Sequence, residues 1–309
     1  MATNSPKKRT AIEAAADRAK TLTQTGLLQE TKEMIAAGQL SLFEFAPWSD
    51  EMRAIPNDLA RAALFTVRNK KIPREIRQNF PIFTTDKNVE ITYTGLELRA
   101  EDDELVWQQV LEYAKRDVLG APVSFSFYQL CTDLGWSING RYYDKAEDCL
   151  TRLQATALKF TSNRIGGVVD SLSLISRFRV LDKGKRTSLC QIQIDPDIVV
   201  LFAGQYYTRF VWEKYRALSP TARRMYDYFA SHKDPRPLPV ETFRLMCGSD
   251  STRPKKWREQ SGSAGDELSG SGLINKTWIT NGLIHCDRGD RALRYRPGPP
   301  PGDHGDREE

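Results

Sequence analysis

The chain has 309 residues, of which 40% are hydrophobic and 10% aromatic, so it can bury one or two cores and has room for two domains of ordinary size. Its formal net charge of +5 is mild and does not by itself indicate a nucleic-acid partner. No segment reaches the roughly 18 to 20 apolar residues that span a bilayer, and the N-terminus lacks the apolar stretch of a secretory signal, so we expect a cytoplasmic protein with no membrane partner.

The sequence lacks the common motifs for metal binding and catalysis. Five cysteines occur without any CxxC pair, and the three histidines are far apart, so we expect no metal and no cofactor. There is no nucleotide-binding loop of the form GxxxxGK[ST], no GxSxG elbow and no HExxH. We therefore expect no catalytic residues and no enzyme activity.

Residues 1–56 are expected to form a flexible N-terminal region. The first 37 residues are rich in alanine and charge, with good helix propensity but little apolar surface to bury. Gly38 favours the end of a helix, so the apolar stretch GQLSLFEFAPW that begins there should be extended. The folded region should begin near residue 57 with a short helix, NDLARAALFTVRN, followed by a strand, VEITYTGLELRA, in which Gly95 marks a turn or bulge.

The central part of the chain predicts three helices followed by two strands. Aspartates can cap a helix over residues 102–115, a second helix over 125–134 ends at Gly135, and a third is expected over about 138–160. Two alternating segments, SLSLISRFRVLD and SLCQIQIDPDIV, then predict strands joined by the basic tip DKGKRT.

The same order of elements recurs further along the chain. A helix that starts at Ser219-Pro220 is followed by the helical segments ETFRLMCG and STRPKKWREQ, and then by two short strands around Asn281-Gly282. The stretch FYQLC lies 116 positions before FRLMC (243 minus 127), which favours an internal duplication.

Three helices followed by a β-hairpin form the winged-helix variant of the helix-turn-helix. The predicted fold class is therefore α+β, with two tandem winged-helix domains over residues 57–203 and 204–288 and a disordered proline- and glycine-rich tail over 289–309. A generic α+β fold built from the same elements is the alternative.

Basic residues on the two third helices and on the first hairpin tip are the DNA-binding candidates. In the second domain, Ser251 or Thr252 can cap the helix and Pro254 suits its first turn, so the charges of RPKKWR project from its start, where base edges are reached. In the first domain, Asp144, Glu147 and Asp148 lower the net charge of the third helix. The stripe of basic residues on that helix is therefore either a solvent face or a DNA face. The candidates are Arg141, Lys145, Arg152, Lys159, Lys183, Lys185, Arg186, Arg253, Lys255, Lys256 and Arg258.

Several long stretches of the sequence resemble one known family. QETKEMIAAGQLSLFEFAPW, DDELVWQQVLEYAKR, DLGWSINGRYY, IVVLFAG and WEKYRALSPTARRMYDYF are similar to the TrfA family, the replication initiators of broad-host-range IncP plasmids. The resemblance implies a bacterial, plasmid-associated protein that binds iteron repeats, opens the adjacent A+T-rich origin DNA, and recruits the host replicative helicase DnaB with help from the host initiator DnaA. It also implies dimers that are inactive for initiation.

Within the apolar N-terminal stretch, five residues resemble the QLxLF peptide by which bacterial replication proteins dock on the β sliding clamp. They are Gln39, Leu40, Ser41, Leu42 and Phe43. An extended peptide can offer the glutamine amide for hydrogen bonds while its apolar side chains fill pockets. The alternative is that this stretch packs on the first domain.

Two other functions are open to a protein with these elements. A two-domain winged-helix transcription regulator would bind a similar duplex without melting origin DNA or touching the clamp, and a nicking or priming enzyme is disfavoured by the missing motifs. Gly262 and Gly265 each cost a helix about 1 kcal/mol relative to alanine, which lowers the expected stability of the second recognition helix.

Overall fold

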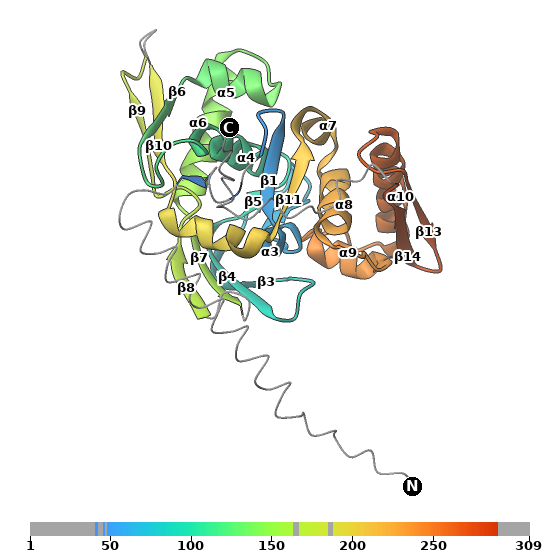
Figure 1. Ribbon diagram of the computed structural model, residues 1–309. Coiled ribbons are helices and arrows are strands. Elements are labelled where there is room, and N and C mark those ends of the chain that lie inside the picture. The colour runs from blue at the N-terminus through green and yellow to red at the C-terminus, as the bar shows by residue number, and fades with distance from the viewer. Residues whose placement is uncertain (1–40, 43–45, 47, 163–166, 185–187, 290–309) are drawn as a thin grey trace, which may run out of the picture.

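Figure 1 shows the computed structural model, which describes residues 41–42, 46, 48–162, 167–184 and 188–289. Residues 1–40 and the tail from residue 290 lie outside the described residues, so the expectations for them stay predictions. Helices and strands are mixed along the chain, as the predicted α+β class requires. No helix in the described ranges combines the length and the apolar character needed to cross a membrane.

The first unit (residues 52–205) contains the three expected helices. They are α4 (Asp103–Ala114), α5 (Phe127–Leu134) and α6 (Gly140–Gln154). Polar caps start each of them: Asp102 accepts from the Asp103 amide, Ser126 from Gln129 and Asn139 from Tyr142. Gly135 ends α5 in the left-handed conformation with φ of 69°, which confirms the predicted stop.

The first unit also contains two larger sheets. One has the strand order β6-β10-β9 and the other the order β3-β4-β7-β8. The predicted hairpin is confirmed as β9 and β10, joined through the basic tip. The strands are β3 (Ile76–Ile82), β4 (Val89–Leu96), β6 (Val123–Phe125), β7 (Ala157–Ser162), β8 (Gly167–Leu172), β9 (Arg177–Leu181) and β10 (Leu189–Gln193), and the 3₁₀ segment η2 (Pro196–Gln205) follows them.

The third helix is shorter than predicted, because the chain changes to a strand. α6 ends at Gln154, and β7 then pairs with β4. Leu158 and Phe160 are buried while Ala157 and Lys159 are exposed, which is the period of two of a half-buried strand. The expectation of one helix through residue 160 was wrong because a short apolar run fits either period.

The predicted helix NDLARAALFTVRN was also wrong beyond its first turn. Only α3 (Asn57–Ala60) is helical, and β2 (Phe65–Thr66) then pairs in parallel with β5 (Leu98–Arg99). Every residue from position 53 to 66 is buried, so the segment has no solvent face of the kind that an amphipathic helix needs.

The second unit (residues 207–289) repeats the order of three helices and a hairpin. α8 (Pro220–Ser231), α9 (Val240–Met246) and α10 (Pro254–Gly270) precede β13 (Lys276–Thr280) and β14 (Leu283–Asp287). Asn281 and Gly282 have φ of 49° and 74°, which confirms the predicted tight turn. The remaining elements of this unit are β11 (Tyr207–Val211), α7 (Trp212–Ala217) and β12 (Leu238–Pro239), with the sheet order β12-β14-β13.

A strand from the N-terminal region joins the two units. β1 (Met52–Pro56) pairs antiparallel with β11, with Met52 opposite Val211. Folded structure therefore begins before residue 57, and this ladder connects a segment ahead of the first unit's helices to the start of the second unit. Figure 1 shows β1 and β11 side by side between the two sets of helices.

Four buried charged residues, called here the buried charge cluster, form a second connection: Glu104 on α4 and Arg223, Arg224 and Asp227 on α8. Arg224 Nη1 lies 2.8 Å from Asp227 Oδ2 and 3.5 Å from Glu104 Oε1, and Arg223 Nε lies 3.3 Å from Glu104 Oε2. All four side chains are fully or almost fully buried. Because each charge is paired, the cluster fixes α8 against α4.

The described part of the apolar N-terminal stretch is packed, not free. Leu42 has an exposed fraction of 0%, Trp48 of 2%, and Ser41 forms a β-bridge with Val118. The Trp48 indole donates to Glu112 Oε2 at 2.7 Å, which fixes this segment on α4. For Ser41 and Leu42 the expectation of a flexible region was wrong and the alternative of packing holds, whereas Gln39, Leu40 and Phe43 lie outside the described residues.

We expect Leu42→Ala to lower the free energy of unfolding by about 2 to 5 kcal/mol, because it leaves a cavity in a closed core. Urea denaturation measures the loss. Ile76→Ala is the matched control, since Ile76 is 88% exposed at a sheet edge and its truncation should leave the free energy of unfolding nearly unchanged. Equal stability of the two variants would contradict the buried placement of Leu42.

Candidate nucleic-acid interface

The start of α10 presents four basic side chains around one buried anchor. Arg253, Lys255, Lys256 and Arg258 are all exposed, whereas Trp257 has an exposed fraction of 1%. The Trp257 ring packs 5.5 Å from the Phe243 ring, and its indole donates to the Val240 carbonyl at 2.9 Å. Trp257 therefore anchors the start of α10 to the core, and its basic neighbours face solvent.

The start of α10 is electrostatically positive. Its first turn holds no acidic residue, and its unpaired backbone amides add the positive end of the helix dipole. Within the described ranges, no salt bridge reaches any of the four basic side chains. Arg253 occupies the cap position without a side-chain bond, so the expected capping by Ser251 or Thr252 was wrong, while Pro254 does stand in the first turn. This surface can attract phosphate groups.

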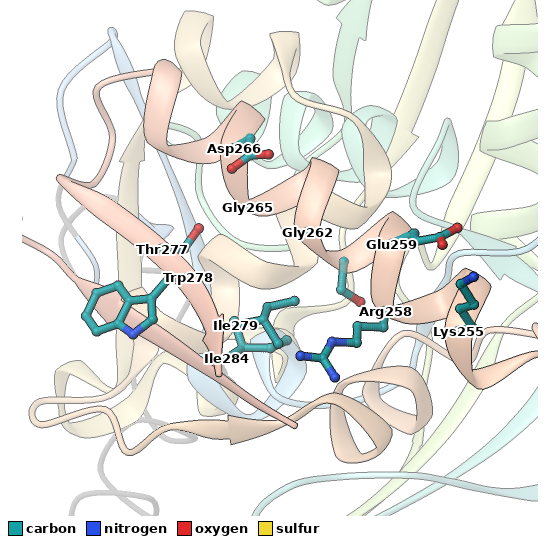
Figure 2. A pocket seen from close by; sticks show the side chains of 11 residues that line it. Lys255, Arg258, Glu259, Gly262, Gly265, Asp266, Thr277, Trp278, Ile279 and Ile284 are labelled. Carbon is teal, nitrogen blue, oxygen red and sulfur yellow. The ribbon is translucent and has the colours of Figure 1, made fainter. Parts of the chain in front are cut away.

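A pocket lies at the boundary between α10 and the second hairpin. It has a volume of about 510 Å³ and is lined on one side by Lys255, Arg258 and Gly262 of α10 and on the other by residues of β13 and β14 (Figure 2). The Arg258 side chain lies between helix and hairpin, beside Ile279 and Ile284, whereas Glu259 points away from the hairpin. An open groove with a cation at its centre can admit a negatively charged chain.

The second hairpin carries an exposed aromatic residue that sequence reasoning missed. Trp278 is 44% exposed, and its ring stacks on His285 at 5.2 Å with an interplanar angle of 6°. The signal was present in KTWIT, because a strand whose Thr277 faces the core must direct Trp278 outward.

On α6 only part of the predicted basic stripe faces solvent. Arg141 is exposed near the start of the helix, and the Lys145 ammonium lies 4.2 Å from the centre of the Trp136 ring, which restrains it by a cation-π contact. Arg141 is thus exposed as predicted, whereas Lys145 is half-buried against the Trp136 ring.

Arg152 was wrongly assigned to this face. Its guanidinium lies 2.9 Å from Asp103 Oδ1, and its side chain is 14% exposed. Burial and the adjacent Asp102 raise the pKa of Asp103 to about 6. Burial alone would lower the pKa of Arg152, but Asp103 raises it above the usual value. Arg152 therefore holds α6 against α4 and does not belong to the solvent-facing stripe.

Lys159 does not share a helical face with the others, because it lies on strand β7, opposite Thr92 of β4. It is exposed on that sheet, away from the helical register in which it was predicted.

The first hairpin carries basic residues in addition to the predicted ones. Lys183 lies 2.5 Å from Glu147 of α6, and this hydrogen bond raises the pKa of the lysine. Lys185 and Arg186 lie outside the described residues. Arg177 and Arg179, both exposed on β9, were missed, although the alternation of RFR indicates that they share one face.

The three candidate metal ligands that lie close together, Asp102, Asp103 and Cys149, are already engaged. Arg74 lies 2.8 Å from Asp102 and 2.6 Å from Asp103, and Arg152 covers the other oxygen of Asp103. Guanidinium groups therefore occupy the positions where a cation would bind, and the cluster is an internal support of α4 and α6.

The two basic surfaces belong to opposite ends of the molecule in Figure 1. The first hairpin extends beside α5 and α6 at one end, and α10 with β13 and β14 forms the other. Such an arrangement offers two separate contact regions on one protein.

Comparison with known proteins identifies the class. The fold is similar to a crystal structure of domains 2 and 3 of RctB, with a TM-score of 0.51 and 13% identity over 75% of this chain and 99% of that one. In sequence, the chain is 65% identical over 282 residues to the plasmid replication initiator protein TrfA of Escherichia coli, covering 91% of this chain and 74% of that protein. The likeness to RctB concerns the fold, and the sequence likeness defines a plasmid replication initiator.

The comparison also identifies the family within this class. Residues 7–288 match the TrfA protein family, and the chain belongs to it.

We expect Arg152→Gln to lower the free energy of unfolding by about 3 kcal/mol, because it leaves Asp103 with one guanidinium instead of two inside the protein. Chemical denaturation measures the change. Arg141→Gln is the control, and its stability should match that of the unchanged protein because Arg141 is exposed. A stable Arg152→Gln variant with weakened DNA binding would restore the original assignment.

Proposed function

We propose that this initiator binds iteron repeats at a plasmid origin through two tandem winged-helix units. The observation that carries the proposal is the start of α10, where four exposed basic residues stand at the N-terminal end of a helix that is followed by a hairpin. In winged-helix proteins the third helix enters the major groove with its first residues near the bases, and the hairpin contacts the backbone. α10 and the β13–β14 hairpin supply these parts.

The side chains of α10 have distinct roles in this proposal. Lys255, Lys256 and Arg258 neutralise phosphates, while Arg253 can make two parallel hydrogen bonds to a guanine. In the first unit, Arg141 and Lys145 of α6 and Arg177 of β9 supply a second, weaker region of contact, because acidic residues of α6 offset part of their charge.

Opening of A+T-rich origin DNA follows from binding in this mechanism. Two separated contact regions can bend or untwist the duplex between them, and the binding energy offsets the cost of deformation. The protein itself catalyses no reaction; the host initiator DnaA assists, and the host helicase DnaB supplies ATP hydrolysis. A dimer of the chain is inactive for initiation.

The segment Gln39 to Phe43 recruits the host β sliding clamp in the same proposal. Because Leu42 is buried, it must leave its place in the core before it can fill a clamp pocket. Clamp binding is thus weaker for the folded chain than for the isolated peptide.

Substitution of α10 tests the DNA interface. We expect Lys255→Ala and Arg258→Ala each to weaken binding to an iteron duplex by about tenfold, and to lower the slope of log affinity against log salt by about one per lost phosphate contact. Fluorescence anisotropy across a salt series measures both quantities. Lys87→Ala, in the exposed turn between β3 and β4, is the control and should bind normally.

The unchanged protein should bind an iteron at least about a thousandfold more tightly than a shuffled duplex. Permanganate footprinting of the A+T-rich region then separates an initiator, which exposes thymines there, from a transcription regulator, which does not. Normal binding by both α10 variants would overturn the proposed interface.

Phe43→Ala together with Gln39→Ala should abolish clamp binding and leave iteron affinity unchanged. Surface plasmon resonance on immobilised clamp measures the first and anisotropy the second. A synthetic peptide of residues 38–48 should bind the clamp more tightly than the whole chain does, since the peptide has no core to leave. Equal clamp affinity of the double variant and the unchanged protein would remove the assignment.

A further inference from the structure

The glycines of α10 differ in what the fold demands of them. A Cβ atom added at Gly265 would lie 2.5 Å from Thr277 Oγ1 and 3.7 Å from Met225 Sδ, so close packing of helix and strand requires a glycine there. A Cβ atom added at Gly262 would meet nothing within 4 Å. The fold therefore gains nothing from Gly262, although a glycine inside a helix costs about 1 kcal/mol relative to alanine.

Gly262 lies on the helical face that borders the pocket between α10 and β13. It follows Arg258 by four positions and Lys255 by seven, so the three residues form one stripe along the helix, and all three line the pocket. Figure 2 shows the bare backbone of Gly262 one turn beyond Arg258, across from the hairpin. Because Gly262 has no side chain, the part of the groove next to Arg258 stays open.

We propose that one sugar-phosphate strand of the bound duplex crosses α10 in this pocket, and that Gly262 lets it approach the helix backbone. The inference rests on the proposed function and adds the position of the strand to it. Glycine is the residue that permits close approach of a backbone to a ligand, and here no contact inside the protein accounts for it.

The distribution of charge favours a strand that crosses the helix over one that runs along it. Lys255 and Arg258 attract phosphate at one end of the pocket, where Glu259 offsets part of their charge but points away from the hairpin. Asp266, two turns beyond Arg258, repels phosphate at the other end. Ile279 and Ile284 form an apolar wall opposite the cations, which suits the deoxyribose carbons between two phosphates. A phosphate strand therefore fits the pocket near Gly262 and turns away before Asp266.

The test compares substitutions at two glycines of the same helix. Gly262→Ala and Gly262→Gln should weaken iteron binding by about tenfold or more, because the new side chain fills the space of the strand. Gly270→Ala is the matched control: its Cβ atom also meets nothing within 4 Å, but Gly270 does not line the pocket. Its iteron affinity should stay within about twofold of the unchanged protein.

Measuring stability distinguishes a variant whose groove is blocked from one whose helix is damaged. The melting temperatures of Gly262→Ala and Gly270→Ala should equal or exceed that of the unchanged protein, since alanine favours a helix. Normal binding by Gly262→Gln with an intact fold would overturn the inference, and so would equal loss of binding in Gly270→Ala. If Lys255→Ala and Arg258→Ala weaken binding while both Gly262 variants bind normally, the interface stands and only the position of the strand is wrong.

Discussion

The buried charge cluster is the constraint on which the arrangement of this protein depends. Four charged side chains without access to water persist only because each has an opposite charge beside it, and removing one partner of such a pair typically costs about 3 to 5 kcal/mol. The residues of the cluster also make hydrogen bonds outside it. Arg224 also donates to the carbonyls of Ala60 and Ala62, and Tyr215 donates to Asp227 at 3.0 Å.

The arginine contacts explain why the chain after α3 is not helical. Buried carbonyls need a donor, and in a helix that donor is the amide four residues on. Here Arg224 supplies it from another element, so the segment can run extended into β2 and remain satisfied. The ladder of β1 with β11 and the bond from the Val67 amide to the Cys247 carbonyl add further links between the units. The two units are therefore joined as one body, which fixes the spacing between α6 and α10.

Local signals predicted the elements that local chemistry determines. Asp102 and Ser219 cap their helices, and Gly135 and Asn281-Gly282 end or turn the chain where the sequence indicates. The errors came from long-range contacts. Arg152 stands among solvent-facing charges in helical spacing, and only its partner Asp103, 49 positions earlier, makes it internal. Leu42 likewise matches a docking peptide, and its burial depends on core contacts that no local pattern reveals.

The two third helices show how the same scaffold can give unequal binding surfaces. On α6, two cations have partners inside the protein: Arg152 pairs with Asp103, and Lys145 lies against aromatic rings. Glu147 of the same helix neutralises Lys183 of the adjacent hairpin. On α10 the one large aromatic residue of the first turn is turned inward, and the basic residues around it face solvent without acidic partners in that turn. Attraction of phosphate grows with uncompensated charge, so in the proposed interface α10 supplies most of the affinity for DNA. The first unit is held rigidly to the second. Its contribution to the proposed interface is then chiefly the position of its few contacts with DNA.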